Sequence, residues 1–226
     1  GVGGRAKTDL TDAQLLARYL RKEKDELRRW MPPPKAYRTL QSLLRRRAAL
    51  VKARTALRQS LSAEPLLKTA LATLLKQIDR IDHLIQKRLR EAAHAAGLRD
   101  QVQRCQAIDG IGELTATALV MAFLRGDFRN SDAFVAFLGL DVRVRDSGKL
   151  KGKRRLTKQG DTEVRRLLHC SAMSGARHPT WKAFYQRYRD RGLKTTQALV
   201  ILARKLARVA FALMKHQENY CAPRLS

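Results

Sequence analysis

Two aspartates lie three residues apart near the start of the chain, in the segment KTDLTD at positions 7–12. If a helix begins there, residues at i and i+3 face the same side, so the carboxylates of Asp9 and Asp12 lie together on its first turn. Neighbouring carboxylates repel each other unless a cation lies between them, and Mg²⁺ takes oxygen ligands of this kind when it assists phosphodiester cleavage. The pair therefore predicts ligands for Mg²⁺. The alternative is that Thr8 or Asp9 caps the helix and Asp12 interacts with its dipole.

A single serine hydroxyl lies in the most basic segment of the chain, residues 143–155. This composition does not fold alone and predicts a loop that meets a phosphate backbone. Basic side chains around Ser147 could hold a phosphodiester and stabilise the charge that develops on it, so the hydroxyl could act as a nucleophile. The alternative is a turn residue between Asp146 and Gly148. The predicted DNA-binding cations of this loop are Arg143, Arg145, Lys149, Lys151, Lys153, Arg154 and Arg155.

Two glycines bracket an apolar residue at Gly110, Ile111 and Gly112. Such a sequence lets the backbone turn sharply and presents free N–H groups at the start of the next helix, where a phosphate can bind. Small residues follow at Thr115 and at positions 116 and 118, as in a helix-hairpin-helix DNA-binding element. These three turn residues are therefore predicted to contact DNA. A plain turn between two helices remains the alternative.

The net charge points to the same class of partner. The chain carries 47 lysines and arginines against 20 aspartates and glutamates, a formal charge of +27 that is spread along its whole length. Charge of this size predicts a polyanionic partner, DNA above all. No stretch approaches the roughly 18 apolar residues of a membrane span, and the first residues lack the apolar core of a signal peptide. We therefore expect a cytoplasmic protein with no membrane partner.

The elements that must position these residues are helical, and the sequence predicts a mainly α fold. A first helix is expected from Asp9 to Trp30, ahead of a run of three prolines. Apolar residues at positions 67, 71, 74, 78, 81 and 85 alternate steps of four and three, which predicts a seam facing a partner helix. With the basic helix before it, this predicts an antiparallel coiled-coil hairpin, an ordinary bundle helix being the alternative. Further helices are expected over 131–138, 161–177 and 179–188, and a last one around Leu206.

Several of these segments together resemble a known family. The segment 7–12, followed by LLAR at 15–18, resembles the last part of the Asp-Glu-Asp-Asp tetrad in transposases of the insertion-sequence 110 family. Residues 107–124, 137–140, 145–149 and 160–177 resemble that family's C-terminal transposase domain. The resemblance implies that Asp9 and Asp12 are the third and fourth acids of a RuvC-like Mg²⁺ site and that Ser147 is the catalytic serine. It also implies a homo-oligomer, dimer or tetramer, in which the serine of one subunit meets the metal site of another, and a structured guide RNA.

The resemblance also predicts the organisation of the chain. Residues 1–31 would be the C-terminal remnant of a RuvC-like metal domain, 32–98 the helical coiled-coil hairpin, and 99–226 the C-terminal transposase domain. The family's first Asp and its Glu lie in an upstream segment, so we expect the chain alone not to cleave DNA. The alternative function is a non-catalytic DNA- or RNA-binding truncated or decayed transposase; a ribosomal type of RNA-associated protein would explain the charge but not the acid pair.

Overall fold

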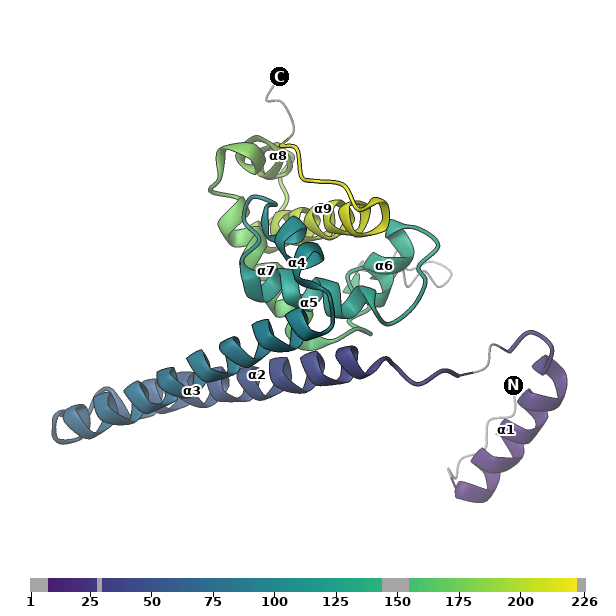
Figure 1. Ribbon diagram of the computed structural model, residues 1–226, viewed down its shortest axis with the longest axis horizontal. Coiled ribbons are helices and arrows are strands. Elements are labelled where there is room, and N and C mark those ends of the chain that lie inside the picture. The colour runs from purple at the N-terminus through teal and green to yellow at the C-terminus, as the bar shows by residue number, and fades with distance from the viewer. Residues whose placement is uncertain (1–7, 28–29, 144–154, 223–226) are drawn as a thin grey trace. The chain divides into compact units, whose positions relative to one another are not determined.

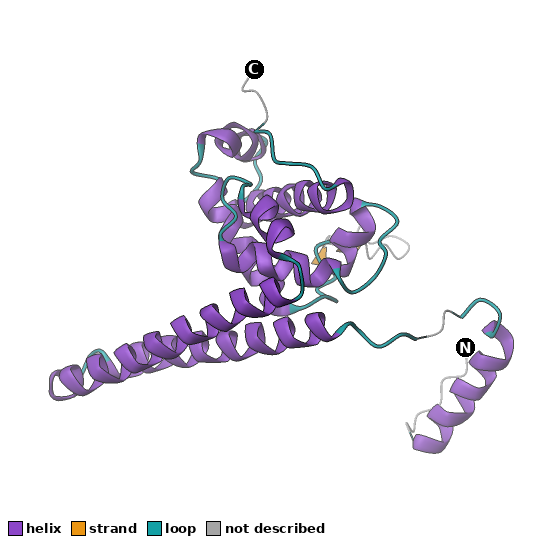
Figure 2. Ribbon diagram, viewed as in Figure 1, coloured by secondary structure: helices purple, strands orange, loops and turns teal. Residues whose placement is uncertain are grey.

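The computed structural model describes residues 8–27, 30–143 and 155–222 (Figures 1 and 2). Within these ranges the fold is mainly α, as predicted, with nine α-helices and one short β pairing. No described helix is long and apolar enough to cross a membrane. The chain divides into two compact units, Gly1–Pro32 and Pro33–Ser226, which are considered separately.

The first unit contains α1 (Asp9–Glu23), and the remaining elements belong to the second. These are α2 (Lys35–Leu61), the 3₁₀ turn η1 (Pro65–Leu67), α3 (Lys68–Ala95), α4 (Arg99–Gln106), α5 (Glu113–Phe123), α6 (Ser131–Phe137), β1 (Val142–Arg143), β2 (Arg155–Leu156), α7 (Thr162–Gly175), α8 (Pro179–Asp190) and α9 (Thr195–His216).

Helix α1 is shorter than its sequence predicts. It ends at Glu23, well before the expected Trp30, and the next residues form turns in which the backbone N–H groups of Glu26 and Leu27 both donate to the carbonyl of Glu23. No residue of α1 is buried. A helix without packing has little to extend it through a charged stretch, because most helical stability in proteins comes from the buried face.

Helices α2 and α3 form the expected antiparallel hairpin, which extends from the rest of its unit (Figure 1). The apolar seam of α3 is only partly covered. Leu71 and Ile78 are 8% exposed, whereas Leu74 and Ile81 are 43% and 47% exposed. The seam faces α2 at Leu71 and Ile78, whereas Leu74 and Ile81 lie at its edge, because a single partner helix does not cover the whole seam.

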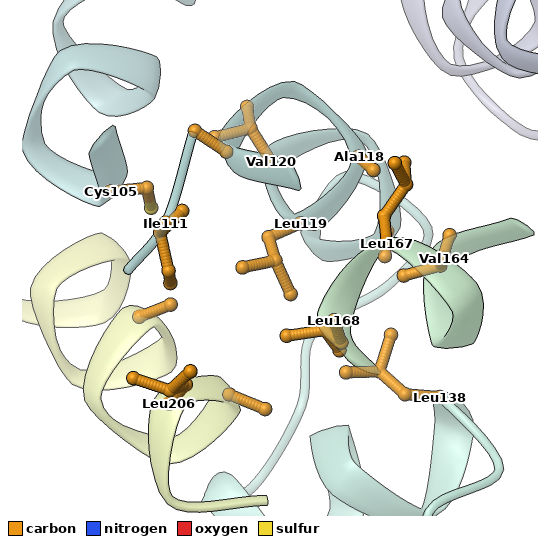
Figure 3. Close-up of a cluster of buried hydrophobic side chains, with 14 of the residues drawn as sticks. Cys105, Ile111, Ala118, Leu119, Val120, Leu138, Val164, Leu167, Leu168 and Leu206 are labelled. Atoms are coloured by element: carbon orange, nitrogen blue, oxygen red, sulfur yellow. The ribbon is translucent and has the colours of Figure 1, made fainter. Parts of the chain in front are cut away.

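The core of the second unit forms around α5 and α9. Helix α5 is buried from Thr115 to Ala122, which is typical of a helix surrounded by other elements. Helix α9 packs on α4, α5, α6, α7 and α8. Its Leu206 lies in the same buried cluster as Ile111, Leu119 and Leu168 (Figure 3). The helices that flank the α4–α5 turn and the basic loop belong to this core, so the core holds both ends of each of these segments.

Strands β1 and β2 pair antiparallel, with Val142 opposite Leu156 and Arg143 opposite Arg155. The backbone N–H of Thr157 donates to the carbonyl of Asp141 over 3.1 Å and continues the pairing. Gly160 packs so closely on the end of α6 that an added Cβ would overlap the backbone of that helix end. The two strands therefore form a fixed stem, with the basic segment 144–154 between them.

Candidate functional site

The acid pair lies on the first turn of α1, and both carboxylates are exposed. Capping is performed by other groups: the Thr11 N–H donates to the hydroxyl of Thr8 over 3.3 Å, and the Thr8 N–H donates to the hydroxyl of Thr11 over 3.1 Å. Within residues 8–27 and 30–143, neither Asp9 nor Asp12 forms an ion pair or a side-chain hydrogen bond. The capping alternative is therefore confirmed for Thr8 and not for Asp9, while both acids lie in the first turn, where their charge favours the helix dipole.

Helical geometry places the acids at one end of an apolar face. Relative to Asp9, the steps to Asp12, Leu16, Tyr19 and Leu20 are three, seven, ten and eleven residues, which all fall on one side of an α-helix. The three apolar side chains are 54–66% exposed. Exposed apolar residues gathered in this way mark a surface that another layer of protein covers. Carboxylates at its end would face that layer.

The described residues do not complete a metal site. No group of three or more histidines, cysteines, aspartates or glutamates close enough to hold a metal lies within them. Asp9 and Asp12 offer two carboxylates, whereas Mg²⁺ requires six oxygen ligands in near-octahedral geometry. The two side chains could supply at most part of the ligand set of a divalent ion, and water or other protein groups would supply the rest.

Much of the basic loop falls outside the described residues. This applies to Ser147 and to the cations Arg145, Lys149, Lys151, Lys153 and Arg154. The backbones of the two predicted cations at its ends lie within the described residues. Arg143 ends β1 and Arg155 begins β2, and the two residues pair across the stem. The Arg155 side chain is exposed.

The predicted helix-hairpin-helix turn joins α4 to α5, and its three residues have different environments. Gly110 has φ +89°, and a Cβ there would lie 2.7 Å from the Cα of Gly175 in α7. Ile111 is 4% exposed and belongs to the core. Gly112 is the N-cap residue of α5, and a Cβ there would meet nothing within 4 Å. Only the Gly112 end of the turn is therefore open to a ligand.

One acidic side chain lies at that open end. Glu113 is the first residue of α5, and its carboxylate forms an ion pair of 3.0 Å with Arg90 of α3. Without this partner its charge would repel a phosphate approaching the backbone N–H groups of the helix start. The ion pair makes the open end compatible with an anion.

Asp109 supports the turn from behind, a role that sequence reasoning missed. Its Oδ2 accepts hydrogen bonds from the hydroxyls of Thr180 (2.7 Å) and Tyr220 (3.4 Å), and its Oδ1 lies 3.5 Å from Nε2 of His178. The indole N–H of Trp181 donates to the Asp109 carbonyl over 2.9 Å. Burial and the neighbouring Asp109 carboxylate raise the pKa of Tyr220 to about 12. Contacts between residues that are 69 to 111 positions apart leave no local sequence signal.

A cationic groove at the base of the hairpin was also missed. It has a volume of about 800 Å³ and lies between α2 and α3. Arg38 and Arg46 are exposed there and form no ion pair within the described residues, whereas Arg88 pairs with Glu91 over 2.9 Å. Exposed guanidinium groups that line one groove suit a phosphate backbone. The groove is lined by Lys35, Arg38, Thr39, Ser42, Leu43, Arg46, Arg88, Glu91, Ala92 and Ala95.

Two family models match the chain. One is described as the transposase IS116/IS110/IS902 family and matches residues 102–186. The other, described as a transposase and named for the DEDD type of IS110, matches residues 2–71 and includes both acids of α1. The two regions lie on either side of the second half of the hairpin.

Curated relatives carry related names. The chain is 28% identical to the pilin gene-inverting protein of Moraxella bovis over 97% of its own length and 69% of that protein. It is 31% identical to a probable family 20 transposase of Pseudomonas aeruginosa over 68% of its length, and 30% identical to the transposase for insertion sequence element IS1111A of Coxiella burnetii over 72%. It spans 45% and 46% of those two transposases.

Proposed function

Because the chain belongs to the IS110 family of insertion-sequence transposases, we propose that it contributes the acid pair and the serine to a DNA strand-cleavage and strand-transfer site. One observation carries the proposal: in the segment that matches the DEDD-type model, Thr8 and Thr11 take over the cap and leave the carboxylates of Asp9 and Asp12 exposed on one helix face. Acids that neither cap the helix nor pair with another described residue are available as ligands.

The proposed reaction joins Ser147 to DNA. The serine oxygen attacks a backbone phosphorus, the bond from phosphorus to a deoxyribose oxygen breaks, and the proton of the serine is transferred overall to that leaving oxygen. Arg143, Arg145, Lys149 and the other loop cations would stabilise the negative charge that develops on the phosphate. A second DNA hydroxyl then attacks the phosphoserine in the reverse sense and completes the strand transfer.

The DEDD type of transposase implies a divalent metal, and we assign Asp9 and Asp12 as two of its ligands, with Mg²⁺ as the ion. When bound, the ion would stabilise charge on the phosphate. The remaining ligands would come from another segment or another subunit, which fits the exposed apolar face beside the acids. The proposed partners are DNA and, by the family likeness, a structured guide RNA, within a cytoplasmic homo-oligomer, dimer or tetramer.

The test is formation of a covalent protein–DNA adduct. The chain is incubated with Mg²⁺ and labelled DNA that spans an insertion-sequence end, alone and together with the acidic upstream segment of an IS110-family transposase. We expect an adduct only in the mixture, none with Ser147→Ala, and a loss of about 100-fold or more with Asp9→Asn or Asp12→Asn. Asp25→Asn, an exposed acid just past α1, is the matched control and should react normally.

A second function is favoured by the cationic groove: non-catalytic binding of nucleic acid, as in a decayed transposase. If no mixture gives an adduct while DNA binding persists, this second function is the correct one. If the chain alone cleaves DNA and Asp9→Asn abolishes the cleavage, the sharing of the metal site is wrong.

A further inference from the structure

A pocket of about 520 Å³ lies beside the stem of the basic loop, where β1 and β2 meet the first turns of α9. Its volume falls within the range of about 300–1,000 Å³ that is common for ligand sites. The walls are mostly apolar, and two guanidinium side chains border them. The lining includes Val142, Leu156, Val200, Ile201, Arg155 and Arg204.

Arg204 is the unusual member of this set. Its Nε is buried and has no hydrogen-bond acceptor within the described residues. Arg208, one turn further along α9, instead places both Nε and Nη2 on Asp132, at 3.0 and 2.7 Å. Arg47 also has a poorly aligned Nε, yet that atom lies 2.9 Å from Asp82 and is compensated by its charge. The side chain as a whole is only partly buried, but a buried N–H without an acceptor is costly, and a ligand in the pocket could supply that acceptor.

We propose that this pocket binds one unstacked nucleotide of the DNA strand, with its base against Val142, Leu156 and Ile201 and its phosphate or a base acceptor on Arg204. The inference rests on the proposed function and identifies how the strand is held beside the serine. Apolar walls accept the face of any base, and a guanidinium suits phosphate and base acceptors. Strand exchange requires bases to leave their stack, which exposes such a nucleotide.

In the sequence, the serine follows the stem beside the pocket by a few residues. Position 147 follows Arg143, the end of the stem, by four residues. Four residues of fully extended chain span at most about 14 Å, so a nucleotide in the pocket lies within a few nucleotides of any phosphate that the serine oxygen attacks. The pocket therefore lies where a base next to the cleaved bond would be held.

The test measures whether binding depends on a base. The full chain is titrated with a short single-stranded thymidine oligonucleotide and with the same backbone carrying abasic sites at its centre. We expect the intact oligonucleotide to bind about tenfold more tightly. Arg204→Gln, and Ile201→Phe, which fills the pocket, should lose this preference. Lys205→Gln removes the same charge from an exposed neighbour on α9 and should keep the preference while weakening both complexes equally.

Each outcome has a defined meaning. Circular dichroism and the melting temperature establish that Ile201→Phe is folded, and Arg204→Gln provides the same test without filling the pocket. Equal binding of the two oligonucleotides by the native chain, or equal effects of Arg204→Gln and Lys205→Gln, would refute the nucleotide pocket. A base preference in the native chain, together with no adduct from that chain in any mixture, would uphold the pocket and refute the catalytic proposal instead.

Discussion

At the scale of single residues, Asp109 and Tyr220 connect distant parts of the second unit. Asp109 lies in the turn before α5, and Tyr220 follows α9, so their hydrogen bond fastens the chain after α9 to the turn. The same carboxylate binds the hydroxyl of Thr180 at the start of α8. One side chain therefore aligns three segments, and its charge affects the acid–base behaviour of the phenol.

The pKa of Tyr220 makes this connection measurable. Burial and Asp109 raise this pKa to about 12 in the folded protein, against about 10 in an unfolded chain. The folded state thus favours the neutral phenol, and its contribution to stability is complete below about pH 10 and is lost as the pH rises toward 12. We expect the difference in free energy of unfolding between native protein and Tyr220→Phe to shrink between pH 9 and pH 11.5, by urea titration. A difference that stays constant over this range would contradict the assignment.

At the scale of elements, the turn between α4 and α5 separates a packing glycine from an open one. Gly110 has φ +89° and contacts α7, whereas Gly112 has φ −85° and an open surround. The first is required by the fold, and the second is available for binding.

We therefore expect opposite results from two alanine substitutions. Gly110→Ala combines a left-handed backbone with overpacking against Gly175 and should lower the free energy of unfolding by about 2–4 kcal/mol. Gly112→Ala should change it by less than about 1 kcal/mol, yet should weaken DNA binding if the helix start receives a phosphate. Urea denaturation and fluorescence anisotropy distinguish the two effects. Unchanged DNA affinity in Gly112→Ala would argue for a plain turn.

The α2–α3 hairpin offers a second pair of contrasting alanine substitutions. Ile78 is 8% exposed and Ile81 is 47% exposed, although both belong to one heptad-like pattern. Ile78→Ala should lower the free energy of unfolding by about 2–4 kcal/mol, and Ile81→Ala by less than about 1 kcal/mol. Thermal melts of the dilute protein provide the comparison. A large loss in Ile81→Ala that grows with protein concentration would instead indicate a partner on that edge.

At the scale of the whole molecule, the net charge of +27 controls association with a polyanion. DNA binding should weaken steeply with salt, because each neutralised phosphate releases a counterion. Arg38→Gln and Arg46→Gln in the groove should each reduce the slope of log K against log salt by about 0.9. Lys76→Gln removes the same charge from an exposed site of α3 away from the groove and should leave the slope nearly unchanged. Equal slopes in all three variants would locate the DNA elsewhere.

The sequence by itself determined the helical fold and the position of the acid pair, because helix periodicity, prolines and spacing of three are local properties, and it left the hairpin as one of two alternatives. It also indicated nucleic acid as the partner through charge alone. It overestimated the length of α1 and left open which seam residues of α3 are covered, since both depend on what packs against these helices.

Only the tertiary structure decided which glycine of the turn is closely packed, how Asp109 joins Thr180 and Tyr220, and that Arg204 Nε meets no acceptor within the described residues. Each of these depends on contacts between segments that are far apart in the chain. Such contacts are set by how side chains fill the space between helices, and no local pattern of residue types encodes that geometry.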